Sequence, residues 1–231
     1  MIYILGAIVA LIISWSVAGY FGSNVEQAKY STLEKKKGYE IREYPAHIVA
    51  QTSVQGSYKD SLNQGFDILA AYIFGGNTKK ENIAMTAPVV AKNEKTIGQS
   101  EKIAMTAPVI VQNEKAVSQS ENIAMTAPVL ATAVGDTQII SFGMPRSYTL
   151  ENLPTPKDSR IKIVTVPAKK YAVMRFSWYS SDARIKQTQE KLLSALKADG
   201  IETQGSMAYA GYNAPWTPPW MTRNEVLIEV K

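Results

Sequence analysis

The chain lacks cysteine altogether and has a single histidine, His47, among its 231 residues. Without cysteine it can form no disulfide, thiolate nucleophile, iron–sulfur cluster, Cys-ligated zinc site or lipoprotein-type acylation. A single histidine also excludes zinc enzymes that use several histidines as metal ligands. These two shortages remove most of the familiar enzyme chemistries.

The chain also has only a small excess of positive charge. The 25 Lys and Arg residues against 20 Asp and Glu residues leave a net charge of +5, and the basic residues are scattered along the chain. This distribution argues against a nucleic-acid partner. With 45% hydrophobic residues, a chain of this length can bury one core of ordinary size but has little room for two. We therefore expect one domain with an appendage.

The N-terminal segment carries no charged side chain through residue 25, and residues 2–21 are almost wholly apolar. A helix of about 20 residues rises roughly 30 Å, enough to cross a hydrocarbon core. Residues 1–25 are therefore predicted to be a membrane anchor that contacts the membrane through residues 2–21, followed by a linker at residues 26–38. The alternative is a signal peptide cleaved after Ser16-Val17-Ala18, although the basic residues that normally begin such a peptide are missing. The anchor predicts a membrane-anchored protein with a single span, the signal peptide a periplasmic or secreted one.

One heptapeptide, Ile-Ala-Met-Thr-Ala-Pro-Val, occurs three times, at residues 83–89, 103–109 and 123–129. Its regular spacing indicates a recent tandem duplication and not a solenoid, because each repeat offers little apolar surface to bury. We expect one copy to be a strand of the domain and the others to form a looped-out insertion, around residues 81–130, which could recruit a protein partner. The repeated methionines, Met85, Met105 and Met125, are soft metal ligands in principle, but methionine on a strand is more often apolar filler.

The rest of the chain shows the same pattern of elements twice, in two halves. Alternating and three- to four-residue hydrophobic spacings predict, for the first half, strands at 39–44 and 47–54, a helix at 57–74, a strand from one repeat and a strand at 138–144. For the second half they predict strands at 161–166 and 170–176, a helix at 182–198, and strands at 206–212 and 224–230. The expected fold class is α+β, with two pseudo-symmetric halves of antiparallel strands, one helix in each half and a ligand groove between them.

Several motifs in the same order resemble the SOUL haem-binding protein family. They are Tyr39-Glu-Ile-Arg-Glu-Tyr-Pro45, Tyr72-Ile-Phe-Gly-Gly-Asn77, the heptapeptide copies, Met144-Pro145 with Tyr148-Thr-Leu150, and Tyr212-Asn-Ala-Pro-Trp-Thr-Pro-Pro219 with Arg223-Asn-Glu-Val226. The resemblance covers residues 39–231 and implies a distorted β-barrel of two pseudo-symmetric halves flanked by two helices. This fold is shared with effector-binding domains of some bacterial regulators. The resemblance also implies noncovalent binding of haem or another tetrapyrrole, with no established reaction.

The residue that would ligate the haem iron departs from the family pattern. Some members have a histidine, proposed as the axial ligand, at the position that aligns with Glu43. His47 is the candidate metal ligand here, because a neutral imidazole can ligate haem iron; an ordinary half-exposed strand histidine is the alternative. Alternation places His47 on the strand face opposite Ile48 and Ala50. A family arginine implicated on the first helix is replaced by Asn63.

The remaining candidate haem contacts are apolar or basic. Haem is a large, flat, apolar ring, and burial of apolar area stabilises a complex by about 25 cal/mol per Å² before the costs of association. The candidate cofactor-binding residues on the first predicted helix and the aromatic loop at 213–220 are Tyr58, Leu62, Phe66, Leu69, Ile73 and Trp216. The helical spacing equally suits any helix that packs on a core. Arg42, Arg175 and Arg223 could each meet a carboxylate as a forked donor, or be ordinary surface charges.

Three functions follow from these features. The leading hypothesis is a membrane-tethered or exported protein that binds haem noncovalently as a carrier, buffer or sensor. The alternative is a binding domain for other amphipathic small molecules, as in regulator effector-binding domains. A tetrapyrrole-modifying enzyme would use carboxylates such as Glu40, Glu43 and Glu225 as acid–base groups. Scattered strand carboxylates are common, so we do not expect an enzyme.

Overall fold

The computed structural model describes residues 2–22, 25–56, 58–80, 119–214 and 216–231. Three α-helices lie in these ranges: α1 (Ile2–Gly22), α2 (Tyr58–Ile73) and α3 (Asp182–Ala198). The strands of the first half are β1 (Glu26–Gln27), β2 (Ser31–Lys35), β3 (Glu40–Tyr44), β4 (His47–Gln55), β5 (Asn77–Thr78), β6 (Thr126–Ala127), β7 (Val129–Val134) and β8 (Thr137–Gly143). The later elements are β9 (Thr155–Pro156), β10 (Lys162–Val166), β11 (Lys169–Phe176), β12 (Thr203–Gly211), the 3-10 turn η1 (Pro219–Met221) and β13 (Asn224–Val230). The α+β prediction and the two halves are confirmed.

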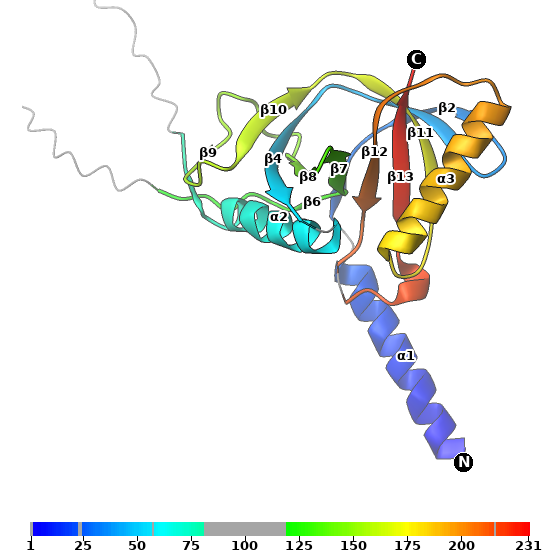
Figure 1. Cartoon of the computed structure of the whole chain (residues 1–231). Helices are drawn as coiled ribbons and strands as arrows, with labels where there is room; N and C mark the ends of the chain where they lie inside the picture. The colour runs from blue at the N-terminus through cyan, green and yellow to red at the C-terminus, as the bar shows by residue number, and fades with distance from the viewer. Residues whose placement is uncertain (1, 23–24, 57, 81–118, 215) are drawn as a thin grey trace, which may run out of the picture.

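A nine-stranded antiparallel sheet has the order β10-β4-β8-β7-β12-β13-β11-β3-β2 (Figure 1). Each half contributes the equivalent strands β4-β8-β7 and β11-β13-β12, which meet where β7 pairs with β12. The first strands of the halves are exchanged: β3 of the first half pairs with β11, and β10 of the second half pairs with β4. Because β10 and β2 end the sheet without pairing to each other, it is open, and the expected distorted barrel describes it only loosely.

Helices α2 and α3 both pack on one face of the sheet, α2 on β4 and β8, and α3 on β11, β12 and β13. Each helix presents one apolar face to the sheet, and the buried side chains of both belong to one core that includes Leu69, Ile140, Leu192 and Val226. A smaller apolar cluster lies on the opposite face of the sheet, around Tyr44, Val173, Tyr212 and Leu227. The two faces of β3, β11 and β13 therefore have different surroundings.

Local signals explain where the helices begin and end. Ser181 caps α3, because its side-chain oxygen accepts a hydrogen bond from the Arg184 amide. After the C-terminal end of α2, the chain turns through Gly75 at φ +105°, a conformation that favours glycine. The buried Asn77 then donates to the Tyr72 carbonyl at 2.7 Å, which satisfies one of the carbonyl groups left free at the helix end.

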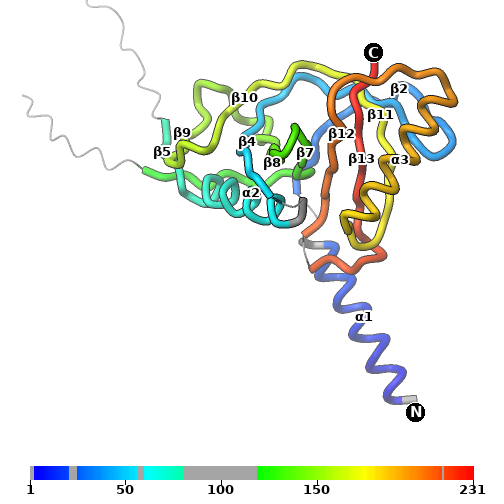
Figure 2. The backbone as a smooth tube through the Cα atoms, in the orientation of Figure 1, coloured from blue at the N-terminus to red at the C-terminus, as the bar shows by residue number. Residues whose placement is uncertain are grey.

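The third heptapeptide copy is part of the fold. Ile123 is buried in the core, Met125 packs against it, and Pro128 lies between β6 and β7, at a strand end as expected for a residue with no amide donor. The other two copies, with Met85 and Met105, lie outside the described residues. The Lys79 amide donates to the Gln119 carbonyl at 2.7 Å, so the described residues on either side of residues 81–118 lie next to each other (Figure 2).

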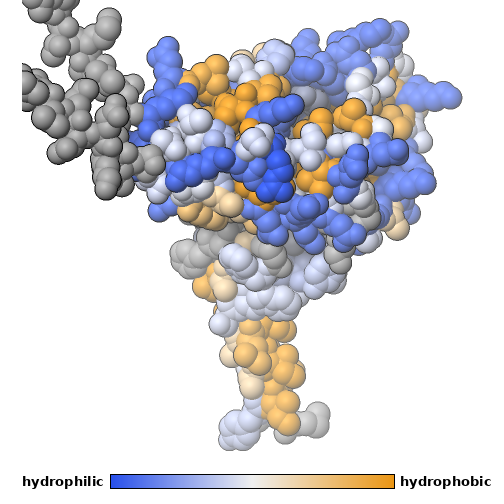
Figure 3. Space-filling model, turned by 60° about the vertical axis from the view of Figure 1, so that its left-hand side comes forward, coloured by the Kyte–Doolittle hydropathy of each residue, from blue (hydrophilic) through white to orange (hydrophobic). Residues whose placement is uncertain are grey.

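Helix α1 projects from the domain, and the N- and C-termini lie at opposite ends of the molecule (Figure 1). Within the described part of the chain it is the one helix long and apolar enough to cross a membrane, a test that a signal sequence also passes. Figure 3 shows it as a largely apolar rod beneath a mainly hydrophilic body. Residues 26–38, expected to be a linker, contain β1 and β2, which pair with β6 and β3.

Candidate functional site

A cleft of about 390 Å³ lies over β3, β11 and β13, on the sheet face opposite α3. Residues two apart on a strand share a face, so Glu40 and Arg42 of β3, Val173 and Arg175 of β11, and Glu225 of β13 all point into it. The connection before β2 and the turn after it complete the wall. The lining residues are Tyr30, Lys35, Lys36, Gly38, Tyr39, Glu40, Arg42, Val173, Arg175, Arg223 and Glu225.

Glu225 is the buried centre of the cleft floor. Its side chain is 0% exposed and forms ion pairs with Arg42 (Nη1 to Oε2, 2.9 Å) and Arg223 (Nη2 to Oε1, 2.8 Å). The Tyr212 hydroxyl donates to Oε2 at 2.7 Å. Both carboxylate oxygens are thus satisfied, which allows a charge to be buried that would otherwise be strongly unfavourable.

The two arginines are themselves fixed by further contacts. Arg42 Nε donates to Glu40 Oε2 at 2.8 Å, and its guanidinium carbon lies 4.2 Å from the centre of the Tyr30 ring. Arg223 stacks on the Tyr212 ring at 3.8 Å and donates to the Gln27 side chain at 3.1 Å. Such cation–π contacts and forked hydrogen bonds hold a guanidinium in one orientation.

The pKa values show the protonation state of this cluster. Burial raises the pKa of Tyr212, and the charge of Glu225 raises it further; burial also raises the pKa of Tyr44. Burial alone would lower the pKa of Arg42, but the hydrogen bond to Tyr44 and the charge of Glu225 outweigh it and raise that pKa. The pKa of Arg223 is raised in the same way by Tyr212 and Glu225. At neutral pH both phenols are neutral and both guanidinium groups are charged.

The rest of the cleft wall is cationic. Lys35 and Arg175 are exposed, and among the described residues neither has an ion-pair partner. Lys36 pairs with Glu34 at 3.1 Å, but both side chains are largely exposed, so water screens this pair. Five basic and two acidic residues line the cleft, so its lining carries a net positive charge.

The family model of SOUL haem-binding proteins matches residues 25–101 and 111–229 of this sequence. The chain belongs to the SOUL haem-binding protein family. Membership in SOUL, a ligand-binding family, supports haem binding as the function. No curated protein matches the sequence.

Solved structures resemble the SOUL domain in fold alone. The EcmrR C-terminal domain aligns over 87% of this chain and 98% of its own with a TM-score of 0.51 and 9% identity. A hydrolase from Listeria innocua aligns over 86% of this chain and 94% of its own, with a TM-score of 0.46 and 10% identity. A putative transcription regulation protein from Staphylococcus aureus MU50 aligns over 85% of this chain and 99% of its own, with a TM-score of 0.42 and 7% identity.

The first-helix residues predicted to form one wall of the ligand groove pack against the core of the SOUL domain. Leu69 and Ile73 are buried in the core. Leu62 and Phe66 are partly buried against that core, and the Phe66 ring packs edge-on against Phe142 at 5.3 Å. Tyr58 begins α2, and its side chain lies outside the described residues. Ligand contact by these residues stays a prediction.

The other predicted site residues, His47 and Trp216, lie in different segments of the fold. His47 begins β4, is half-buried, and its Nδ1 lies 2.9 Å from the Pro45 carbonyl oxygen. Trp216 is exposed in the loop before η1, where its carbonyl accepts a hydrogen bond from Trp15 of α1. Neither residue lines the cleft, and the role of His47 as an iron ligand stays a prediction. Among the described residues no group of three His, Cys, Asp or Glu side chains could hold a metal ion.

The three arginines considered for carboxylate binding, in contrast, come together. Arg42, Arg175 and Arg223 lie on or beside three different strands and line one cleft. Of the three carboxylates considered for an enzyme, Glu40 and Glu225 belong to the same cluster, whereas Glu43 is exposed. Three lining residues of the expected linker, Tyr30, Lys35 and Lys36, were not predicted from the sequence. The run of lysines at 35–37 was the available signal.

Proposed function

We propose that the protein binds haem or a related tetrapyrrole noncovalently, with its carboxylates in the cationic cleft, and that α1 holds it at a membrane as a haem carrier, buffer or sensor. Membership in the SOUL family supports the ligand class. The observation behind the site is the meeting of Arg42, Arg175 and Arg223 in one cleft beside aromatic side chains. A tetrapyrrole such as haem combines an apolar ring with carboxylates, the two chemistries that this lining offers.

Different basic residues have different tasks in this site. Arg42 and Arg223 are already paired with Glu225, so they hold the cleft floor in shape and add a directed hydrogen-bonding surface. Arg175 and Lys35 are exposed and form the new charge-assisted hydrogen bonds to the ligand. A volume of about 390 Å³ lies at the small end of ligand sites, so the cleft takes the carboxylate edge of the ring.

Iron coordination is not required for this mode of binding. No histidine lines the cleft, and its carboxylate-binding groups are equally suited to haem and to iron-free protoporphyrin. The bound iron would supply redox or gas-binding chemistry, while the basic residues of the cleft recognise the carboxylates. Coordination by His47 would require a different position of the ring, which the experiment below tests separately.

The experiment is an absorbance titration of the full-length protein in mild detergent with haem and with iron-free protoporphyrin IX. We expect saturable binding of both ligands. In Arg175→Gln the affinity for each should fall approximately tenfold, since a charge-assisted hydrogen bond contributes about 1.5 kcal/mol or more. In Arg184→Gln the affinity should not change. Arg184 is the matched control because it is exposed on α3, the other side of the sheet. No saturable binding would overturn the proposed ligand.

Two other results would place the ligand elsewhere. Binding of haem but not of protoporphyrin, with loss of haem binding in His47→Ala, would make His47 the iron ligand and refute the cleft. Binding unaffected by Arg175→Gln and Lys35→Gln but weakened by Phe66→Ala would place the ligand at α2. Binding of organic cations in place of either tetrapyrrole would support the alternative, a domain for other amphipathic molecules.

Helix α1 makes specific contacts with the domain, and these support a retained anchor. The Trp15 indole donates to the Trp216 carbonyl at 2.8 Å, and a Cβ atom at Gly19 would overlap Pro218. Cleavage after Ala18 would remove the first contact and leave Gly19 at a charged terminus. We expect the intact mass of protein extracted from membranes to include residues 2–18. Recovery of a soluble chain that begins at Gly19 would overturn the anchor and leave the ligand proposal intact.

A further inference from the structure

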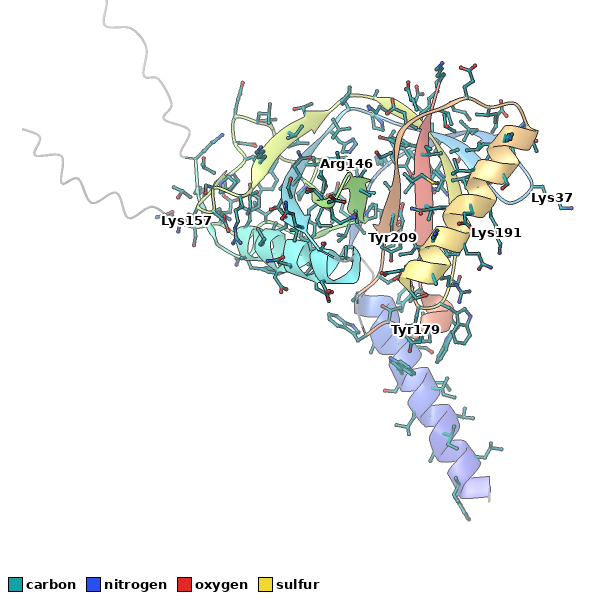
Figure 4. All side chains as sticks on the ribbon, viewed as in Figure 1. Lys37, Arg146, Lys157, Tyr179, Lys191 and Tyr209 are labelled. Carbon is teal, nitrogen blue, oxygen red and sulfur yellow. The ribbon has the colours of Figure 1, made fainter. Side chains whose placement is uncertain are left out.

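All four tryptophans of the chain lie in one region, where α1 meets the domain. They are Trp15, Trp178, Trp216 and Trp220, and between 43% and 60% of each is exposed. Tyr179, beside Trp178, is also exposed, and Figure 4 shows it next to the domain end of α1. We call these five residues the aromatic collar. Outside α1 and the collar, Phe74 is the one strongly exposed aromatic residue among those described.

Direct contacts join α1 to the loop that contains Trp216 and Trp220. The Trp15 indole nitrogen donates to the Trp216 carbonyl at 2.8 Å, and the Trp15 and Trp220 rings pack edge-to-face with centroids 5.3 Å apart. One turn further along the helix, Gly19 is buried, and only the lack of a side chain lets the backbone approach Pro218. The loop is therefore fixed against the last two turns of α1.

Trp178 and Tyr179 come from a second loop that is bonded to the first. The Trp178 amide donates to the Pro219 carbonyl at 3.0 Å, and the Trp178 carbonyl accepts from Asn224 Nδ2 at 2.8 Å. Trp178 has φ +77°, an unfavourable conformation for a bulky residue that costs on the order of 1 kcal/mol. These hydrogen bonds hold the strained backbone, and the aromatic side chain remains exposed.

The two loops share an uncharged composition. Residues 177–181 and 213–222 contain no Asp, Glu, Lys or Arg. Their aromatic, serine and threonine residues are of intermediate hydropathy, and Figure 3 shows a pale zone between the apolar α1 and the mainly hydrophilic body. Tryptophan and tyrosine next to neutral polar groups are typical of the boundary between hydrocarbon and water in membrane proteins.

The length of α1 places this band relative to a bilayer. Residues 2–14, before the first collar contact, form a helix of only about 20 Å at 1.5 Å per residue, whereas a hydrocarbon core is about 30 Å thick. The segment from Trp15 to Gly22, which lies against the loop, adds about 12 Å. If α1 crosses the bilayer, Trp15 and Gly19 lie in the interfacial layer or in the hydrocarbon just below it. The loop fixed to these residues must lie there too.

We infer that the aromatic collar is a membrane-binding surface that inserts into the interfacial layer of a phospholipid bilayer and seats the domain directly on the membrane. This inference rests on the proposed insertion of α1. Its partner is the uncharged upper part of the acyl chains and the glycerol region, because the loops present aromatic rings and no charge. The domain is then held in one orientation and does not move freely on a tether.

Intrinsic fluorescence tests this inference directly, because the collar contains every tryptophan of the chain. Full-length proteins that retain only Trp178, only Trp216 or only Trp220, with the other tryptophans changed to Phe, are reconstituted in phosphatidylcholine vesicles. Half of the samples use lipid brominated at acyl carbons 6 and 7, which quenches nearby indoles. We expect each collar tryptophan to lose about half of its emission in brominated lipid. Phe replaces each indole with an aromatic ring, so the loops keep their packing.

Two matched controls use a background without native tryptophan. Ile8→Trp reports insertion of α1 and is expected to be quenched. Phe74→Trp places an indole at an exposed position at the far end of α2 and is expected to remain unquenched. Quenching of Ile8→Trp without quenching of Trp178 and Trp216 would refute membrane insertion of the collar and leave the anchor standing. The same result is expected if the collar binds a partner protein. Absence of quenching at Ile8→Trp would refute both.

The unsubstituted protein gives a second measurement should the Phe variants fail to fold. If Trp15 alone enters the bilayer, quenching is limited to the share of one indole among four. Loss of a larger share of the total emission in brominated lipid, expected to be about half, would require at least one of the loops to be inserted. A loss no larger than the share of one indole would refute the inference.

Discussion

Replacement of Glu225 by Gln removes the buried negative charge at the floor of the cleft and keeps its shape. The carboxylate is 0% exposed and pairs with Arg42 at 2.9 Å and Arg223 at 2.8 Å. Removing one partner of a buried ion pair leaves an uncompensated charge and costs about 3–5 kcal/mol. We expect Glu225→Gln to lower the free energy of unfolding by about 3 kcal/mol or more, a large fraction of the 5–15 kcal/mol typical of a folded domain.

The same strand offers a control. Glu229 points to the same face of β13 and pairs with Lys169 at 2.6 Å, but the two side chains are 20% and 32% exposed. Because water screens partly exposed pairs, Glu229→Gln is expected to cost about 1 kcal/mol or less. The two variants thus compare pairs of similar length that differ in burial.

Urea unfolding of the full-length protein in mild detergent, followed by near-ultraviolet circular dichroism, measures this difference. With a slope of about 1–3 kcal/mol per M urea, a cost of about 3 kcal/mol in Glu225→Gln should lower the midpoint by about 1–3 M, with no change in slope. In a double-mutant cycle with Arg42→Met, the two costs should fall short of additivity by about 0.5–3 kcal/mol. Equal midpoints for Glu225→Gln and Glu229→Gln, or additive costs in the cycle, would refute the ion-pair reasoning.

Three further predictions concern other parts of the fold. A Cβ atom at Gly65 of α2 would overlap Cγ1 of the buried Ile140. Although alanine favours helices, we therefore expect Gly65→Ala to destabilise the protein by about 1–2 kcal/mol in urea unfolding. A neutral or stabilising effect would contradict the packing of α2 on β8. Burial and then the Asp199 hydrogen bond raise the pKa of Tyr39 to about 12, above the ordinary value of about 10. This contribution to stability is fully present below pH 10 and is lost as the pH rises toward 12; stability measured over that range should fall less steeply in Tyr39→Phe, and equal slopes would refute it. Deletion of residues 84–123 leaves one heptapeptide and puts residues 81–83 in place of residues 121–123, which have the same sequence, so cooperative unfolding and ligand binding should persist; loss of the cooperative transition would show that the extra copies belong to the core.

The spacing of apolar residues predicted most helices and strands well, because that spacing depends on which side chains are buried. Leu192 and Leu196 recur at helical spacing on α3, and Ala50, Thr52 and Val54 alternate along β4, as the structure confirms. The short strands β1, β2, β5 and β9 lacked such a signal. Residues 31–35, which form β2, are exposed throughout, so no apolar alternation distinguished this edge strand from a linker.

The assembly of the cleft could not be predicted in the same way. Alternation indicates that Arg42 and Glu225 each lie on one face of a strand, but it does not identify the neighbouring strands. The two residues are 183 positions apart, and β11 lies between their strands in the sheet. The apolar spacing of Leu69 and Ile73 likewise does not distinguish a core-facing helix from the wall of a groove, since both require the same periodicity.

The exchange of β3 and β10 has a consequence for how the chain can be divided. A fragment that ends before β10 would retain β3 with no β11 to pair with, and its β4 would have an open edge in place of β10. The complementary fragment would retain β10 with no β4 to pair with, and its β11 would lack β3. Two such fragments, cut in the connection at residues 144–154, supply each other's missing edge strands. The chain is therefore built like a swapped dimer whose two subunits have been fused, and a split version should recover its fold only when both pieces are present.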